Sequence, residues 1–170
     1  MFEIDKFNIV FDITKETPYF QVDSAHRIRF SMDELNLSLL KDILKSIFEC
    51  SQPLHLIFVS EYIMDNVRCS SKSKLGRYLT IRNWKEHAVV DEFSGDGAVY
   101  TLIRNLNLTE VMNYCTQVYK GNTQAYIAFY NDDFLMYVST DVVDIVSWDD
   151  IKIQNLKEKY ASHYNRYYDN

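Results

Sequence analysis

The stretch from residue 124 to residue 150, QAYIAFYNDDFLMYVSTDVVDIVSWDD, constrains the fold more than any other part of this chain. Short runs of apolar and aromatic residues at 126–130, 134–138 and 142–148 are separated by Asp, Asn, Ser and Thr. The Asn-Asp-Asp at 131–133 has the composition of a tight turn, so the first two runs predict a β-hairpin. The third run predicts another strand. Four aspartates at the edges of this third run predict an acidic rim on the sheet: Asp141, Asp144, Asp149 and Asp150.

Apolar residues that recur at three- and four-residue spacing predict three helices. The first covers residues 36–50, where Asn36 is a candidate N-cap. The second begins at residue 107 or at residue 109 and runs to residue 119. The closing helix covers residues 149–168, with Asp149 as its N-cap and an increasingly aromatic stripe.

The remaining strand candidates lie before and after the first helix in the sequence. Residues 54–59 are a nearly continuous apolar run, which is typical of a central strand covered on both faces. Residues 98–104 predict a further strand. Residues 7–13, 19–22 and 26–30 predict an N-terminal meander, and two alternating arginines give its last strand a basic face. This order predicts an α+β fold, a mostly antiparallel sheet with three main helices packed on it.

The composition agrees with one domain spanning residues 1–170. The chain is 47% hydrophobic and has only 4 Gly and 2 Pro, so it can close a core and has little material for linkers. The net charge of −6 argues against a general phosphate-binding role and favours a cationic partner. Ordinary solubility explains the same charge equally directly.

The cysteines and the N-terminal sequence bear on the compartment. The chain has three cysteines, Cys50, Cys69 and Cys115, and their spacing matches no paired motif. An odd number of widely spaced cysteines is typical of proteins in a reducing compartment. Glu3 and Asp5 interrupt the first residues, so these resemble neither a signal peptide nor a membrane segment. We therefore expect a cytoplasmic protein that does not enter a membrane.

No motif in the chain specifies a reaction. The four histidines lie 29 or more residues apart, and no glycine-rich phosphate loop or nucleophile motif is present. The adjacent pairs at 132–133 and 149–150 could act as paired carboxylates, but turn and cap roles explain them more simply. We therefore expect no enzymatic activity, no cofactor and no metal site.

Residues 68–85 offer an alternative function. Six basic residues in this segment are interleaved with Tyr78 and Trp84, as on a surface where nucleic-acid bases stack. This pattern predicts a nucleic-acid-binding or regulatory module. The competing interpretation is a solvated segment whose aromatic residues pack inward, and the negative charge of the whole chain favours it.

Three runs resemble a family of small acidic bacterial proteins of unknown function. They are YTLIRNLNLTEVMNY at 100–114, QAYIAFYNDDFLMYVSTDVVDIVS at 124–147 and LKEKYASHYNRYYDN at 156–170. Members of this family look like immunity proteins of polymorphic or contact-dependent toxin systems. The family's Tyr-Asp-Asp-Arg-Gly run is Tyr-Val-Ser-Thr-Asp here at 137–141, and its last-helix Trp is Tyr164.

The resemblance and the charge together predict a non-enzymatic immunity or inhibitor protein. It would bind a cognate toxin domain, such as a nuclease, and occlude its basic cleft. The residues expected to bind the partner are acidic turns and two aromatic anchors: Asp132, Asp133, Asp141, Asp144, Asp91, Glu92, Asp96, Tyr130 and Tyr137.

Overall fold

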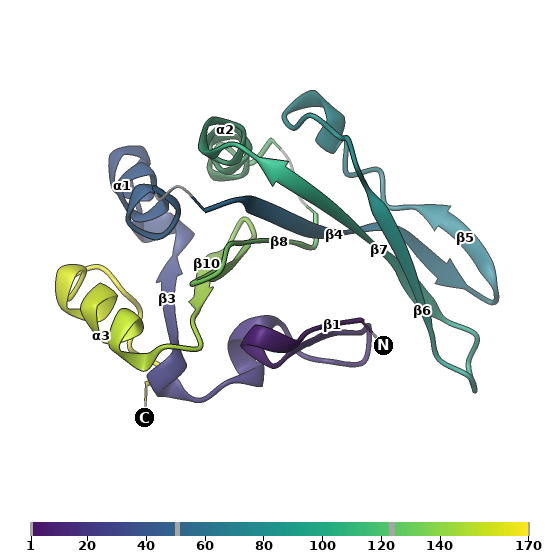
Figure 1. Cartoon of the computed structure of the whole chain (residues 1–170), viewed down its shortest axis with the longest axis horizontal. Helices are drawn as coiled ribbons and strands as arrows, with labels where there is room; N and C mark the ends of the chain where they lie inside the picture. The colour runs from purple at the N-terminus through teal and green to yellow at the C-terminus, as the bar shows by residue number, and fades with distance from the viewer. Residues whose placement is uncertain (1, 50–51, 123–124, 170) are drawn as a thin grey trace.

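An eight-stranded antiparallel sheet forms the centre of this computed structural model, which describes residues 2–49, 52–122 and 125–169 (Figure 1). The strand order is β3-β10-β9-β8-β4-β7-β6, and β5 also pairs with β4. The α+β fold predicted from the sequence is confirmed. The strands of this sheet are β3 (Arg27–Ser31), β4 (Leu54–Met64), β5 (Val67–Ser70), β6 (Lys85–Val90), β7 (Gly97–Leu106), β8 (Ile127–Tyr130), β9 (Leu135–Val138) and β10 (Val142–Val146).

Three helices cover one face of the sheet: α1 (Leu37–Phe48), α2 (Leu108–Tyr119) and α3 (Asp150–Lys159). Their apolar stripes pack on alternate residues of the strands, including Leu56 and Phe58 of β4. The predicted N-caps at Asn36 and Asp149 are confirmed, because each side chain accepts a hydrogen bond from a backbone N–H in the first turn. Of the two starts expected for the second helix the structure has the earlier one, with Asn107 as its N-cap. Asn107 also forms a reciprocal capping box with Glu110.

A small hairpin of β1 (Phe2–Ile4) and β2 (Ile9–Phe11) covers the opposite face (Figure 1). Ile9 and Phe11 are fully buried and pack against Ile57 and Val59 of β4. β4 is therefore covered on both faces over its first half, as its continuous apolar run predicts.

The prediction of an N-terminal meander is wrong. Residues 9–11 pair with β1 in a separate two-stranded sheet, and Pro18–Gln21 is a 3₁₀ turn. β3 pairs with β10 at the edge of the main sheet instead. The closing helix ends at Lys159, earlier than the expected residue 168. The expected end of the first helix at residue 50 and the start of the opening stretch at residue 124 lie outside the described residues.

Arg29 and Asp144 form a buried ion pair between β3 and β10. They are directly opposite in the strand register, and the guanidinium donates two hydrogen bonds to the carboxylate, at 2.6 and 2.8 Å. Asp144 is 0% exposed and Arg29 is 9% exposed. The guanidinium also lies 4.1 Å from the ring centroid of Tyr19 in the 3₁₀ turn. The expected basic face of β3 is therefore turned inward at Arg29, and the expected acidic rim does not include Asp144.

The first prediction concerns this pair. Asp144→Ala leaves a buried guanidinium without its carboxylate, and we expect it to lower the free energy of unfolding by about 3–5 kcal/mol. Replacing both partners, as Arg29→Met with Asp144→Leu, should recover most of that loss. Urea denaturation measures both effects. Asp141→Ala, which removes an exposed carboxylate, is the control, and a cost for Asp144→Ala as small as the control's would contradict the assigned role.

Candidate functional site

The acidic residues predicted to bind a partner lie in separate places. Asp132 and Asp133 occupy the β8–β9 turn, and Asp141 lies exposed in the β9–β10 turn. Asp144 is buried, as described above. The remaining three lie in the β6–β7 loop, at the end of the sheet farthest from α1 and α3 (Figure 1): Asp91, Glu92 and Asp96.

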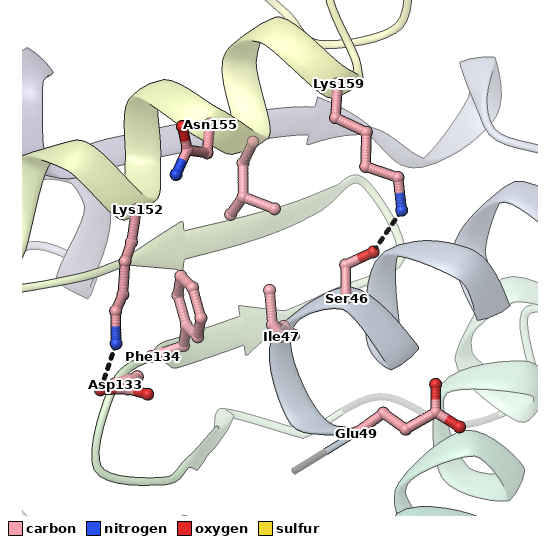
Figure 2. A pocket seen from close by; sticks show the side chains of 9 residues that line it. Ser46, Ile47, Glu49, Asp133, Phe134, Lys152, Asn155 and Lys159 are labelled. Carbon is pink, nitrogen blue, oxygen red and sulfur yellow. Dashed lines mark hydrogen bonds and ion pairs between the residues drawn. The ribbon is translucent and has the colours of Figure 1, made fainter.

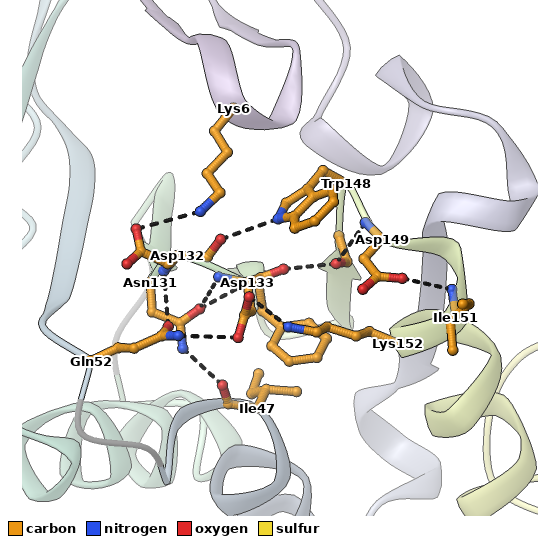
Figure 3. Close-up of polar contacts among 12 residues, drawn as sticks. Lys6, Ile47, Gln52, Asn131, Asp132, Asp133, Trp148, Asp149, Ile151 and Lys152 are labelled. Atoms are coloured by element: carbon orange, nitrogen blue, oxygen red, sulfur yellow. Dashed lines mark hydrogen bonds and ion pairs between the residues drawn. The ribbon is translucent and has the colours of Figure 1, made fainter.

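Hydrogen bonds fasten the β8–β9 turn to the end of α1 and to the segment that follows β10 (Figure 3). The Asn131 side chain, which is 3% exposed, donates to the Ile47 carbonyl and accepts from the backbone N–H groups of Asp133 and Phe134. Ser147 Oγ donates to the Asp133 carbonyl at 2.7 Å. These contacts hold the backbone of the turn in one conformation.

Both carboxylates of this turn have cationic partners (Figure 3). Asp133 lies 2.6 Å from Lys152 Nζ and also accepts from Gln52, while the more exposed Asp132 lies 3.5 Å from Lys6 Nζ. The hydrogen bond from Lys152 is the main reason why the pKa of Asp133 lies below its ordinary value. The negative charge of this turn is thus largely neutralised within the chain.

A cavity of about 500 Å³ lies beside the turn, between α1 and α3 (Figure 2). Ile47, Phe134 and Leu156 form its apolar lining. Lys152 and Lys159 lie at its two ends, and Lys159 donates a hydrogen bond to Ser46 at 2.7 Å. Lys152 is paired with Asp133 and Lys159 with Asp42, so the charges of both lysines are compensated, whereas Glu49, which also lines the cavity, has no ion pair among the described residues.

The β4–β5 and β6–β7 loops meet at the far end of the sheet, which we call the acidic tip and define as residues 64–67 and 91–96. The Asn66 N–H donates to the Gly95 carbonyl at 3.3 Å, and the Asp65 N–H donates to the Asp96 carboxylate at 3.1 Å. Gly95 has a φ of 75°, and a Cβ there would come within 2.8 Å of the Asn66 side chain. The two loops therefore form one joined surface.

The acidic tip carries unneutralised charge and exposed apolar side chains. In the part of the chain that the structure describes, no ion pair involves its four carboxylates: Asp65, Asp91, Glu92 and Asp96. Phe93 is 99% exposed, and Met64 and Val67 are more than half exposed. The sequence predicted the acidic loop at 91–97. It did not predict that Met64 and Val67 lie beside this loop, because only the pairing of the β4–β5 and β6–β7 hairpins brings them there.

The two expected aromatic anchors are partly buried on the face that carries the β1–β2 hairpin. Tyr130 stacks against His55 at 5.2 Å between ring centroids, and burial raises the pKa of its hydroxyl to about 12. Tyr137 lies 5.3 Å from the ring of Tyr126 and lines a cavity with it. Tyr137 is thus the better placed of the two for contact with a ligand.

The basic segment at 68–85 is only in part free to bind. Arg68 is paired with Glu61 and Glu86, and Tyr78 packs on the buried ring of Tyr114. Trp84, which is 60% exposed, is the one aromatic side chain of the predicted stacking surface that remains accessible. Tyr78 therefore packs inward, as the competing interpretation of this segment predicts, whereas Trp84 does not.

Within residues 2–49, 52–122 and 125–169, no group of three or more His, Cys, Asp or Glu side chains is placed to hold a metal ion. The helices of the same ranges are all too short or too polar to cross a membrane. Comparison with protein-family models, curated proteins and solved structures found no match for this chain. The resemblance to immunity proteins stays a prediction.

The second prediction follows from the pair of Asp133 and Lys152. A carboxyl whose pKa is lowered by folding stabilises the protein above its unfolded pKa of about 3.9, and this contribution is lost as the pH falls through the folded pKa. We expect Asp133→Asn to be less stable than the natural chain at pH 7, with the difference shrinking in strong acid. Urea denaturation at both pH values measures it.

The control for this experiment is Asp141→Asn, which removes one exposed negative charge at another turn. A deficit for Asp133→Asn that is equally large in strong acid would show that the side chain acts through something other than its charged pair with Lys152.

Proposed function

We propose that this chain is a non-enzymatic, cytoplasmic inhibitor of the immunity-protein class, which binds a basic partner protein through its acidic tip. The proposal rests above all on Phe93, whose side chain is 99% exposed among four carboxylates that form no ion pair with any described residue. A large apolar side chain held in water on a well-defined loop has no role in the core of its own chain. Phenylalanine, like the other aromatic residues, is enriched in the buried cores of protein interfaces.

The conformation of the loop supports a preformed binding surface. The Asp91 carboxylate accepts hydrogen bonds from the backbone N–H groups of Phe93 and Ser94, and the Asp91 N–H donates to the Asp96 carbonyl at 2.8 Å. Phe93 is therefore presented by an internally bonded turn. Preorganisation of this kind reduces the entropy lost when a partner binds.

Charge supplies the argument for a basic partner. The chain carries a net charge of −6, and the four carboxylates of the acidic tip have no counterion among the described residues. An acidic surface steers a cationic partner during the encounter and disfavours acidic ones. A toxin nuclease fits this description, because its active-site cleft must attract phosphates. In the proposed mechanism the tip occupies that cleft and excludes the nucleic acid.

The third prediction tests Phe93 with the product of the neighbouring reading frame as the candidate partner. If the two proteins associate, Phe93→Ser should increase the dissociation rate by roughly tenfold to a hundredfold, as expected for an aromatic hot spot. Surface plasmon resonance measures the rate. Tyr167→Ser, which removes an aromatic ring that is 78% exposed at the other end of the molecule, is the matched control.

The fourth prediction concerns the acidic charge of the tip. Glu92→Lys should slow association with the same partner and flatten the dependence of the association rate on salt, with a smaller effect on dissociation. Asp132→Lys at the neutralised β8–β9 turn provides the comparison. Equal effects of the two substitutions would contradict the choice of the tip, and the absence of any association at submicromolar concentration would overturn the proposed function.

A further inference from the structure

We propose that a tyrosine-lined pocket on the hairpin-covered face of the sheet binds an arginine side chain. The pocket has a volume of about 320 Å³, and its lining residues come from β4, from the ends of β5 and β8, and from β9: Tyr62, Ser71, Ala125, Tyr126, Tyr137 and Ser139. This inference rests on the proposed function, in that the arginine would belong to the basic partner, but its test below needs no partner.

The pocket exists because β4 changes its neighbour along its length. Residues 55–58 pair with β8, whereas residues 61–64 pair with β5 on the same side of the strand. A β-bulge interrupts the pairing with β7 between Val59 and Glu61. At this point the Val59 N–H donates to the Tyr126 carbonyl and the Ser71 N–H donates to the Ser60 carbonyl. The ends of two strands thus diverge around one bulge, and side chains leave a hollow there.

Aromatic faces and hydroxyls form the walls of the hollow. The rings of Tyr126 and Tyr137 are 5.3 Å apart and tilted by 54°, and Tyr100 lies 6.4 Å behind Tyr126. Ser71 Oγ is buried and has no hydrogen-bond partner within the residues that the structure describes. A guanidinium group satisfies this combination, because its plane stacks on aromatic rings while its five N–H groups donate to oxygens.

The electrostatic surroundings of the pocket are also suited to a cation. Burial raises the pKa of the Tyr137 hydroxyl above its ordinary value, and the carboxylates of Asp144 and Asp141 raise it further, while Arg29 opposes them. Arg29 is already paired with Asp144, so Asp141 adds a net negative charge. The tyrosine stays uncharged near neutral pH, and its hydroxyl can accept a hydrogen bond from a cationic donor.

The pocket is continuous with the acidic tip. Tyr62, which is 43% exposed, forms one wall of the pocket, and Met64 lies two residues further along the same strand. Residues two apart on a strand share a face of the sheet, so Tyr62 and Met64 form an aromatic and apolar path from the pocket to the tip. A partner whose basic surface contacts Phe93 could therefore insert one arginine into the pocket.

The fifth prediction uses the purified chain alone, with its tyrosine rings isotopically labelled for NMR. Titration with N-acetyl-arginine methylamide should give saturable shifts of the Tyr62, Tyr126 and Tyr137 ring signals. The citrulline analogue, which has the same shape without the charge, should give little change. Tyr62→Ser, at the exposed rim, should weaken arginine binding by roughly fivefold, as the loss of one cation–π wall implies. Tyr167→Ser should not weaken it.

The inference would be overturned by shifts that do not saturate, by an equal response to citrulline, or by unchanged affinity in Tyr62→Ser. A larger response to the corresponding lysine derivative would also overturn it, because an ammonium lacks the planar fork on which the assignment depends. Since this titration contains no partner, it separates the pocket from the tip. Arginine binding with no partner association would refute the proposed function alone, whereas partner association without arginine binding would refute the pocket alone.

Discussion

Burial of β4 on both faces is the constraint on which the rest of the structure depends. The helices pack against Leu56 and Phe58, and the β1–β2 hairpin packs against Ile57 and Val59. A strand buried on both sides must lie inside the sheet, which leaves β3 and β6 at the ends of the strand order. The second half of β4 carries the exposed side chains of Tyr62 and Met64, and it leads to the acidic tip and forms one wall of the tyrosine-lined pocket.

The Arg29–Asp144 pair shows how one strand edge is completed with charged residues. Arg29 and Asp144 each lie between apolar neighbours in their strands. Taken alone, this alternation predicts that both side chains lie on a solvent-exposed face of the sheet. The 3₁₀ turn at Pro18–Gln21 instead covers this face with Tyr19, so both charges are removed from water together. Such burial is tolerated only because the two groups are opposite in register and form two hydrogen bonds.

The same reasoning separates the acidic residues by role. Aspartates in the β8–β9 turn are held by Lys6, by Gln52 and by Lys152 of α3, while the contact of this turn with α1 is made by Asn131. The carboxylates of the tip lack such partners among the described residues, and their loop presents Phe93 to solvent. A sequence pattern of Asp-rich turns does not distinguish these cases, because the neutralising lysines are 126 and 19 residues away from their aspartates in the chain.

The sequence by itself determined the α+β class, the three helices, two of their N-caps at Asn36 and Asp149, and the buried strand at 54–59. These features depend on local periodicity and on hydrogen bonds within a few residues, which a single chain segment already contains. Only the tertiary structure decided that β3 joins β10, that Asp144 is buried, and that two distant loops form the acidic tip. Those outcomes depend on contacts between residues 29 to more than 100 positions apart, and a local sequence pattern does not specify which distant residues meet.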